Sequence, residues 1–155
     1  MMSDDKVTIE RLNTGYKWSL FGRQWVKING RYMLKRLKII QTPYFAILLT
    51  KIYRPDSERY PHTHFRSAVS FIISGGYVEK VYTEQEYLSS YHHRYHNRWS
   101  FHTIPKSIAH TITKVDKPLW TLLFAGRMKG EFVFWTPEGK IDYREYGRDR
   151  ERNVS

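Results

Sequence analysis

Short apolar runs separated by turn residues form the main pattern of hydrophobic and polar positions along this chain. Trp25–Ile28 and Arg31–Leu34 flank the dipeptide Asn29-Gly30, which suits a two-residue hairpin turn because both of its positions tolerate a positive φ. Residues 44–53 are almost continuously apolar, as expected for a strand that is covered on both faces. The pattern therefore predicts β-strands, starting with a hairpin around Asn29-Gly30.

The same pattern continues towards the C-terminus. Ala68–Ile73 is apolar and Tyr77–Tyr82 alternates, with Ser74-Gly75-Gly76 between them, which predicts a second hairpin. Further strands are expected over residues 98–104, 110–115, 119–124, 131–136 and 141–146. About ten short strands of this kind predict an all-β sandwich or barrel, in a single domain over residues 16–147.

Three segments lack such a pattern. Residues 1–15 are mixed polar and are expected to form a flexible N-terminus, and residues 148–155 are charged and are expected to form a frayed tail. The polar interval 84–97 has no apolar period and is expected to be a loop. It contains the cluster His92-His93-Arg94-Tyr95-His96, for which metal or phosphate capture is the alternative to an exposed loop.

Composition narrows the possible chemistry and location. The 155 residues suffice for one domain with a sizeable core. The chain has no cysteine, which excludes disulfides and thiolate ligands, so a transition metal would be bound through nitrogen and oxygen. No apolar stretch approaches the length that spans a membrane, and the start of the chain is polar and acidic. We therefore expect a cytoplasmic protein with no membrane partner.

Positive charge is concentrated in the first part of the chain. The formal net charge is +11, and residues 11–55 contain ten Lys or Arg residues and no Asp or Glu. Such a region attracts phosphates and other anions, although a solvated surface that aids solubility is the alternative. Nucleic-acid binding is a further hypothesis, because aromatic residues lie among these cations: Tyr16, Trp18, Trp25 and Tyr32.

Histidines supply the candidate chemistry. In a β-strand alternate side chains share a face, so His62 and His64 of His62-Thr63-His64 would point into one cavity. His110 on a neighbouring strand would complete a three-histidine metal site, which leaves coordination positions open for substrate and water. The alternative is a barrel that binds its ligand without a metal.

These histidines also carry a resemblance to the cupin superfamily, whose motifs are G-x5-H-x-H-x3,4-E-x6-G and G-x5-P-x-G-x2-H-x3-N. The chain resembles the first motif in His62, His64 and the closing Gly75 or Gly76, and the second motif in Pro105 and His110. The ligand Glu of the first motif is replaced by Ala68 or Val69. The other departures are at Asp56, Trp99, Ser107 and Lys114. Residues 31–146 further resemble small bacterial and phage cupin-like proteins.

The resemblance implies a fold and a cofactor. The fold is an all-β, single-domain cupin-type double-stranded β-helix, or jelly-roll barrel, here with an N-terminal β-hairpin extension. The implied cofactor is a divalent transition metal on His62, His64 and His110. Fe(II) is the first candidate, because the three-histidine pattern is similar to that of thiol dioxygenases and some dioxygenases of dicarbonyl compounds; Ni, Mn and Zn are the others. A homodimer formed through edge strands is also expected.

Cupins include oxygenases, isomerases, epimerases and binding proteins, so the resemblance leaves the function open. The first hypothesis is a metal-dependent enzyme that acts on a small anionic molecule by dioxygenase- or isomerase-like chemistry. The second is a non-catalytic module that captures a nucleotide, nucleotide-sugar or signalling molecule.

Five other residues are candidates for the site. Glu79 would act as the partner of a ligand histidine or as a general base, and His102 would line the cavity or support a ligand histidine. The alternatives are a glutamate that faces water and a structural histidine. Substrate-binding candidates are Arg66, which alternation places on the side of His64, Arg127 and Trp120.

Overall fold

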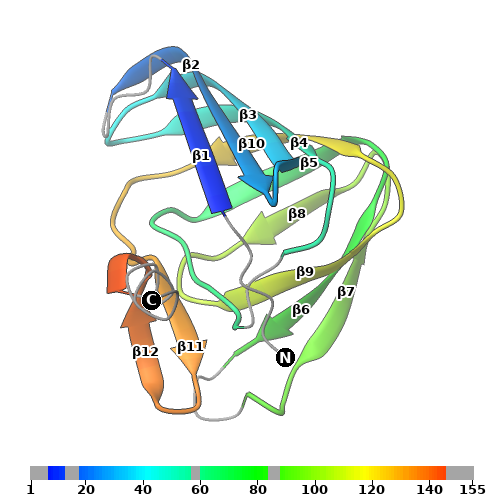
Figure 1. Ribbon diagram of the computed structural model, residues 1–155, viewed down its shortest axis with the longest axis vertical. Coiled ribbons are helices and arrows are strands. Elements are labelled where there is room, and N and C mark those ends of the chain that lie inside the picture. The colour runs from blue at the N-terminus through cyan, green and yellow to red at the C-terminus, as the bar shows by residue number, and fades with distance from the viewer. Residues whose placement is uncertain (1–6, 13–17, 57–59, 84–87, 146–155) are drawn as a thin grey trace.

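The computed structural model describes residues 7–12, 18–56, 60–83 and 88–145, and these residues fold almost entirely into β-strands (Figure 1). A short helical segment occupies residues 143–145. The strands are β1 (Val7–Leu12), β2 (Ser19–Ile28), β3 (Arg31–Gln41), β4 (Ala46–Ile52), β5 (Ala68–Ser74), β6 (Tyr77–Tyr82), β7 (His92–His96), β8 (Phe101–Ile104), β9 (Ala109–Val115), β10 (Leu119–Ala125), β11 (Val133–Thr136) and β12 (Gly139–Asp142).

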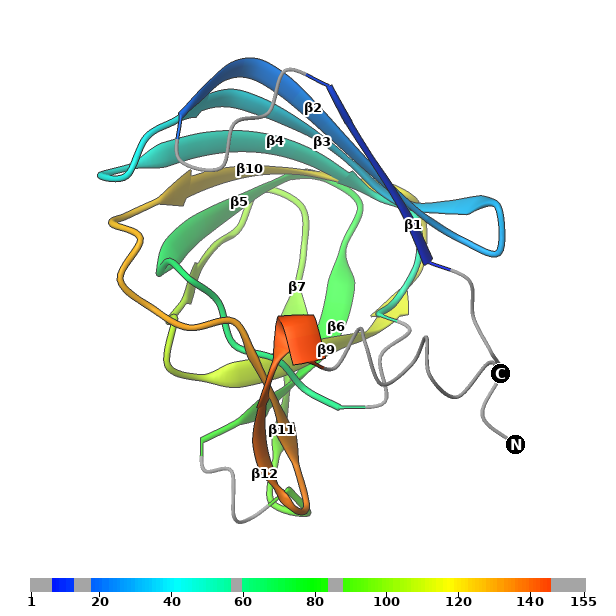
Figure 2. The same ribbon diagram turned by 60° about the vertical axis from the view of Figure 1, so that its left-hand side comes forward.

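Two antiparallel sheets face each other across the molecule. The larger sheet has the order β1-β2-β3-β4-β10-β5-β8, and the smaller has the order β7-β6-β9. Figure 2 shows the large sheet curving over the top of the barrel, with β6, β7 and β9 on the opposite side. The β11–β12 hairpin extends from the lower end of the molecule (Figure 1). The predicted all-β barrel is therefore confirmed.

The hairpin predicted around Asn29-Gly30 is present. It joins β2 and β3, and Ile28 pairs with Arg31 across the turn. Asn29 has a φ of 52° and Gly30 a φ of 75°, the combination that a two-residue hairpin turn requires. The local turn chemistry therefore fixed this element independently of the rest of the fold.

The prediction of a second hairpin, between β5 and β6, is wrong. β5 pairs with β10 and β8, whereas β6 pairs with β7 and β9, so the chain changes sheets at Ser74-Gly75-Gly76. Gly75 has a φ of 80°, and a Cβ at this position would lie 2.7 Å from the Cβ of Leu119. The double glycine thus serves a sharp corner between two sheets, where side chains have neither the conformational freedom nor the space.

Two edge strands lie where the sequence predicted none. β1 pairs with β2 within the expected flexible N-terminus, and β7 pairs with β6 within the expected loop of residues 84–97. Both occupy sheet edges, where exposed polar side chains weaken the hydrophobic period on which the prediction depended. The predictions for residues 1–6, 13–17, 84–87 and 148–155 lie outside the described residues.

The two faces of the large sheet differ in chemistry. The inner face carries polar rows in which residues of neighbouring strands pair directly, such as Arg36, Thr50 and Thr121 on β3, β4 and β10. Ser70 on β5 pairs with His102 on β8 in the next row. The side chains of Thr50, Thr121, Ser70 and His102 are buried. The large sheet therefore brings polar groups into the interior of the barrel.

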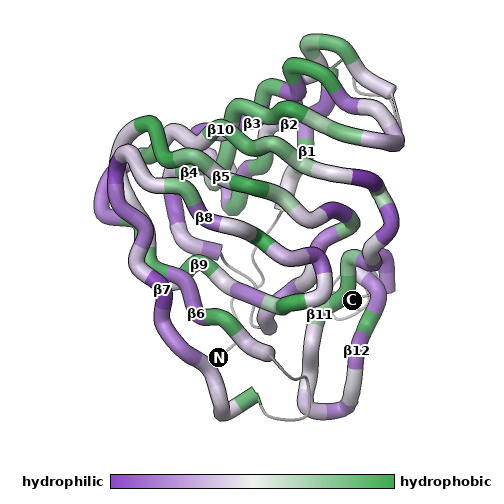
Figure 3. Tube along the Cα trace, turned by 180° about the vertical axis from the view of Figure 1, so that it is seen from behind, coloured by the Kyte–Doolittle hydropathy of each residue, from purple (hydrophilic) through white to green (hydrophobic). Residues whose placement is uncertain are grey.

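The outer face of the large sheet carries an apolar row. One row crosses five strands in register and consists of Leu37, Leu49, Leu122, Phe71 and Phe101. Phe101 is 67% exposed and Phe124, on the same face, is 46% exposed. Figure 3 shows hydrophobic colour along much of β4, β5 and β10 and hydrophilic colour along β7.

Apolar packing inside the barrel is divided between two clusters. Ile72, Tyr77 and Leu119 form one cluster near the Gly75 corner, and Tyr82, Ala109 and Trp135 form the other. Within the described residues, no helix combines the length and hydropathy that crossing a bilayer requires.

Candidate metal centre

The structure brings together the three histidines that the sequence singled out. His62 and His110 exchange two backbone hydrogen bonds, each of 3.1 Å, so the two residues lie directly opposite each other. The rings of His62 and His64 have centroids 5.0 Å apart. One possible ligand atom from each of the three residues lies within 4.8 Å of the other two. We call His62, His64 and His110 the histidine triad.

The segment that carries His62 and His64 is not the strand that the sequence predicted. His62 makes isolated bridges to β9 and β11, and Thr63 fixes the segment by donating a side-chain hydrogen bond of 2.6 Å to the carbonyl of Glu131. The carbonyl of His64 approaches Gly130 so closely that a Cβ there would collide with it. The two imidazoles converge because β9 and β11 hold this segment, rather than because of strand alternation.

The Nε2 atoms of His64 and His110 face each other at 2.6 Å. Two unprotonated lone pairs at this separation would repel, so the pair either shares one proton or faces a common cation. Meanwhile Nδ1 of His110 donates a hydrogen bond of 2.5 Å to Oε2 of Glu79. Because Nδ1 holds its proton on this carboxylate, a neutral His110 directs the lone pair of Nε2 towards His64.

Glu79 connects His110 to the interior of the smaller sheet. Its side chain is 1% exposed, and Oε1 accepts a hydrogen bond of 2.8 Å from Nε2 of His96. Burial by itself raises the pKa of this carboxyl, but the hydrogen bonds from His110 and His96 and the charges of these rings outweigh it and hold the pKa well below its usual value. Glu79 is therefore a carboxylate that fixes His110 in one tautomer.

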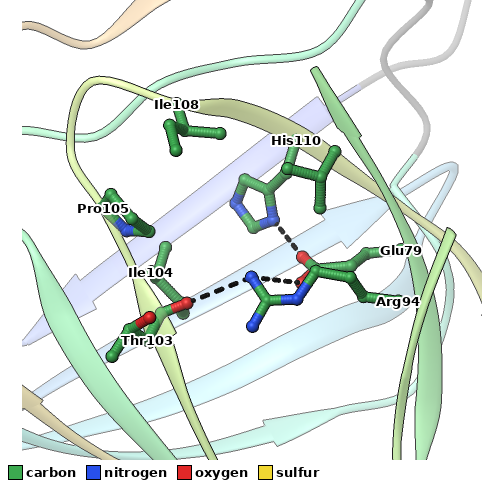
Figure 4. Close-up of a pocket in the computed structure, with 8 residues that line it drawn as sticks. Glu79, Arg94, Thr103, Ile104, Pro105, Ile108 and His110 are labelled. Carbon is green, nitrogen blue, oxygen red and sulfur yellow. Dashed lines mark hydrogen bonds and ion pairs between the residues drawn. The ribbon is translucent and has the colours of Figure 1, made fainter. Parts of the chain in front are cut away.

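Figure 4 shows the small pocket beside this carboxylate, where the side chains of His110 and Arg94 both approach Glu79. Nη1 of Arg94 lies 3.8 Å from Oε1 of Glu79 and donates a hydrogen bond of 3.4 Å to the carbonyl of Thr103. The pocket has a volume of about 10 Å³, which is close to the space that one water needs. Besides its two histidines, Glu79 therefore has a guanidinium near its carboxylate.

Burial keeps His64 neutral. The pKa of His64 lies well below its ordinary value, first because of burial and then because of the charges of His110, His62 and Arg36. Neutral imidazole is the form that binds a metal ion. His62 and His64 are nevertheless only partly buried.

Aromatic residues from the β11 region cover one side of the triad. Phe132 stacks on His62 with ring centroids 5.4 Å apart and an angle of 19° between the planes, and it meets His64 edge-on at 6.0 Å. Phe134 lies 5.8 Å from His62. These rings pack against the triad histidines from this side. The sequence gives no signal for this contact, because it depends on the isolated bridge between His62 and β11.

Comparisons with solved structures address the fold. The Fe(II) form of HppE with the alternative substrate (S)-1-HPP aligns with a TM-score of 0.50 at 8% identity, over 81% of this chain and 57% of that chain. KdgF from Halomonas sp. aligns with a TM-score of 0.45 at 18% identity, over 61% of this chain and 82% of that chain. An RmlC-like cupin from Shewanella frigidimarina aligns with a TM-score of 0.45 at 15% identity, over 61% of this chain and 76% of that chain.

The protein has a cupin fold. No protein-family model matches the sequence, and no curated protein matches it. The cupin fold explains why a chain with incomplete motifs still brings His62, His64 and His110 together, because the barrel supplies the geometry.

A second group of possible ligands lies deeper in this cupin barrel. It consists of Glu79, His96 and His102, all buried, and we call it the buried cluster. The rings of His96 and His102 stack with centroids 3.7 Å apart, and the hydroxyl of Tyr77 is hydrogen-bonded to Nε2 of His102 at 2.6 Å. Burial, followed by the charge of His96, lowers the pKa of His102 to about 4.

The donor atoms of the triad fit a divalent transition metal better than those of the buried cluster. In the buried cluster Nε2 of His96 is committed to Glu79, Nε2 of His102 is committed to Tyr77, and Arg94 already supplies positive charge near the carboxylate. In the triad the Nε2 atoms of His64 and His110 are directed at each other. Imidazole ligands without thiolates suit iron, nickel and zinc.

The other predicted site residues have different surroundings. Glu79 and His102 are buried, and Glu79 contacts the triad directly. The Nη atoms of Arg66 donate hydrogen bonds of 2.7 and 2.5 Å to the carbonyls of Gly126 and Thr42, so this guanidinium is committed to the backbone rather than presented to a ligand.

Arg127 and Trp120 lie at the surface. Arg127 is exposed and lies over the ring of Tyr44 at 5.3 Å. Trp120 is 38% exposed, on the outer face of β10, where the amino group of Lys51 lies 5.3 Å from its ring. The inner position next to Trp120 is Thr121, which is buried. The structure therefore does not bring Arg127 or Trp120 to the triad.

Arg36 is an inner-face residue that the sequence analysis did not select. Its Nε donates a hydrogen bond of 3.1 Å to Oγ1 of Thr50, and its charge is among the causes that lower the pKa of His64. The ten cations of residues 11–55 looked equivalent in the sequence, and only the register of β3 against β4 separates Arg36 from its outward-facing neighbour Lys35.

Proposed function

We propose that this protein is a metal-dependent cupin enzyme that acts on a small anionic molecule, with a divalent transition metal held by His62, His64 and His110. The observation that supports this most strongly is the arrangement of His110. Glu79 holds the proton on Nδ1, and Nε2 faces His64 at 2.6 Å. Paired carboxylate and histidine groups of this kind orient metal ligands and raise their basicity.

A divalent ion on the triad would supply Lewis-acid or redox chemistry at coordination positions that the protein leaves open. The protein's own groups have separate tasks. Glu79 fixes the tautomer of His110, Phe132 limits water on one side of His62, and the partial exposure of His62 and His64 gives a small molecule access. Oxygenation or isomerisation of an anionic substrate is the chemistry we propose for this arrangement.

Fe(II) is the first ion to test. HppE, which shares the fold, was solved with Fe(II), and three neutral imidazoles suit this ion as well as nickel and zinc. Because affinity for divalent ions rises from Mn to Cu, a purified sample takes up whichever tight-binding ion is abundant. Reconstitution must therefore be done without oxygen and with one ion at a time.

The test is the metal content of untagged protein after anaerobic reconstitution with Fe(II), measured beside His62→Ala/His110→Ala. The control is His92→Ala/His93→Ala, which removes two exposed histidines of β7 and leaves the triad intact. We expect stoichiometric metal in the wild type and the control, and none in the triad variant with its fold retained.

Wild-type protein that takes up no ion would overturn the proposal, as would a folded triad variant that keeps the metal. If metal is bound but candidate anions are recovered unchanged both in air and without oxygen, the protein is a binding module and the enzymatic part of the proposal is wrong.

A further inference from the structure

A cationic side chain lies on the inner face of the large sheet, in a row with two buried hydroxyls. Arg36 pairs with Thr50, and Thr50 pairs with Thr121. Thr50 is 1% exposed and Thr121 is 2% exposed. Because Nε of Arg36 donates to Oγ1 of Thr50 at 3.1 Å, the guanidinium lies against this row inside the barrel and not on the outer surface.

The charge of Arg36 has no counter-ion in the described part of the chain. No carboxylate there forms an ion pair with Arg36 or with Lys38, which follows two residues later on the same face of β3. Burial lowers the pKa of Arg36. Burial, followed by the charges of Arg36, Arg11 and Arg66, lowers the pKa of Lys38 to about 8. Both cations are partly buried, and because partly buried cations without a partner are costly, an anion between them would stabilise both.

A polar atom in the same row also lacks a partner. Oγ1 of Thr121 is buried, and no described residue forms a hydrogen bond with it. Its cross-strand neighbour Thr50 is the residue that accepts the hydrogen bond from Arg36. A threonine hydroxyl has a donor to offer to an anion that reaches the guanidinium.

This inner row and the histidine triad share the interior of the barrel. Thr50 and Thr121 are buried on the large sheet, and His110 is buried on β9 of the facing sheet.

We infer that Arg36, assisted by Lys38 and Thr121, binds the oxyanion group of the ligand, a carboxylate or a phosphate-type group. The planar guanidinium matches both groups by paired hydrogen bonds. The inference identifies the substrate class of the proposed enzyme, and it rests on the proposed function only for the role of the triad. Arg36 thus takes the place of Arg66 as the expected anion-binding residue, since Arg66 is hydrogen-bonded to the carbonyls of Gly126 and Thr42.

The test is calorimetric titration of metal-free protein with two probes, inorganic phosphate and acetate. Arg36→Gln removes the charge, and Lys35→Gln is the matched control because Lys35 is the adjacent cation on the outer face, over the ring of Tyr32 at 4.0 Å. We expect Arg36→Gln to weaken binding of the preferred probe by about tenfold to a hundredfold, the range that charge-assisted hydrogen bonds cover. The control should change it by less than about twofold.

Arg36→Lys keeps a positive charge and guards against loss of fold; we expect it to retain part of the affinity. Preference for phosphate would assign a phosphate-type substrate, and preference for acetate a carboxylate. Equal binding by wild type and folded Arg36→Gln would overturn the inference, as would the absence of binding of both probes to the wild type. Metal uptake is measured separately. Metal binding without anion binding would reject this inference alone. Anion binding without metal uptake would reject only the proposed function.

Discussion

The histidine triad and the buried cluster use the same side chains for different purposes. In the triad, His62 and His64 remain partly exposed and the Nε2 atoms of His64 and His110 converge. In the buried cluster, His96 and His102 are stacked, and each has its Nε2 atom in a hydrogen bond within the protein. Glu79 belongs to both arrangements. The two arrangements therefore differ in whether the Nε2 atoms are directed at one another, as in the triad, or are already hydrogen-bonded to Glu79 and Tyr77, as in the buried cluster.

The largest expected effect is a loss of stability that differs between alanine variants of His110 and His64. His110→Ala removes a hydrogen-bond donor from a buried carboxylate and should lower the free energy of unfolding of metal-free protein by about 1.5–3 kcal/mol, the range for hydrogen bonds to a charged group. His64→Ala leaves the contact between Glu79 and His110 intact and should cost clearly less. Urea unfolding of both variants measures the difference, and equal losses would contradict the role of His110 as the stabilising partner of Glu79.

A second variant tests the link between the two arrangements. Glu79→Gln preserves size but removes the carboxylate that holds the proton on Nδ1 of His110. We expect the affinity of the triad for Co(II) to fall by about tenfold to a hundredfold, as for other partners of ligand histidines. Glu138→Gln, at an exposed position, is the control. Unchanged affinity in Glu79→Gln would mean that the carboxylate serves only the buried cluster.

Acid should weaken the buried cluster in a defined pH window. Burial and then the charge of His96 lower the pKa of His102 from 6.5 to about 4, so between these values the unfolded chain binds more protons than the folded one. Stability therefore decreases as the pH falls from about 6.5 towards 4. Glu79, whose pKa is held low, adds a further loss below its ordinary value of 4.5.

Urea midpoints of metal-free protein at several pH values between 7 and 4 would measure this decrease. His102→Phe should flatten the slope, whereas His93→Ala, at an exposed position of β7, should leave it unchanged. A slope in His102→Phe equal to that of the wild type would assign the acid sensitivity to other groups.

The smallest expected effect concerns the hydroxyl of Tyr77. Tyr77→Phe removes the hydrogen bond to His102 and should cost about 1 kcal/mol of unfolding free energy, with metal affinity nearly unchanged. Tyr95→Phe is the matched control, because Tyr95 is 72% exposed. A large loss of metal affinity in Tyr77→Phe would show that the buried cluster positions the triad more strongly than the single contact through Glu79 implies.

The parts of this molecule that the sequence predicted are those set by local chemistry. Asn29-Gly30 required a hairpin whatever surrounded it, and His62, His64 and His110 were recognisable by their spacing. His102 was correctly placed on the face opposite Trp99 and Phe101, because strand alternation decides this: His102 is buried while Phe101 is exposed.

The parts that the sequence could not predict depend on pairing between distant strands. Gly75 and Gly76 were equally compatible with a hairpin and with a corner between sheets, and only the partners of β5 and β6 decide between them. Likewise, Arg66 follows the alternation of His64 but is captured by backbone carbonyls. The position of Arg36 beside Thr50 depends on the register of β3 against β4. The residues next to Arg36 in the sequence do not predict that register.

The apolar outer face of the large sheet has a consequence for handling the protein. The row that ends at Phe101 is partly exposed to water. The formal net charge of +11 keeps molecules apart only while that charge is unscreened. Added salt shortens the screening length from about 10 Å at 0.1 M to about 3 Å at 1 M, and salting-out ions strengthen apolar association. Concentrated salt, the usual means of stripping nucleic acid from a basic protein, should therefore promote precipitation here, whereas dilute buffer keeps the molecules dispersed.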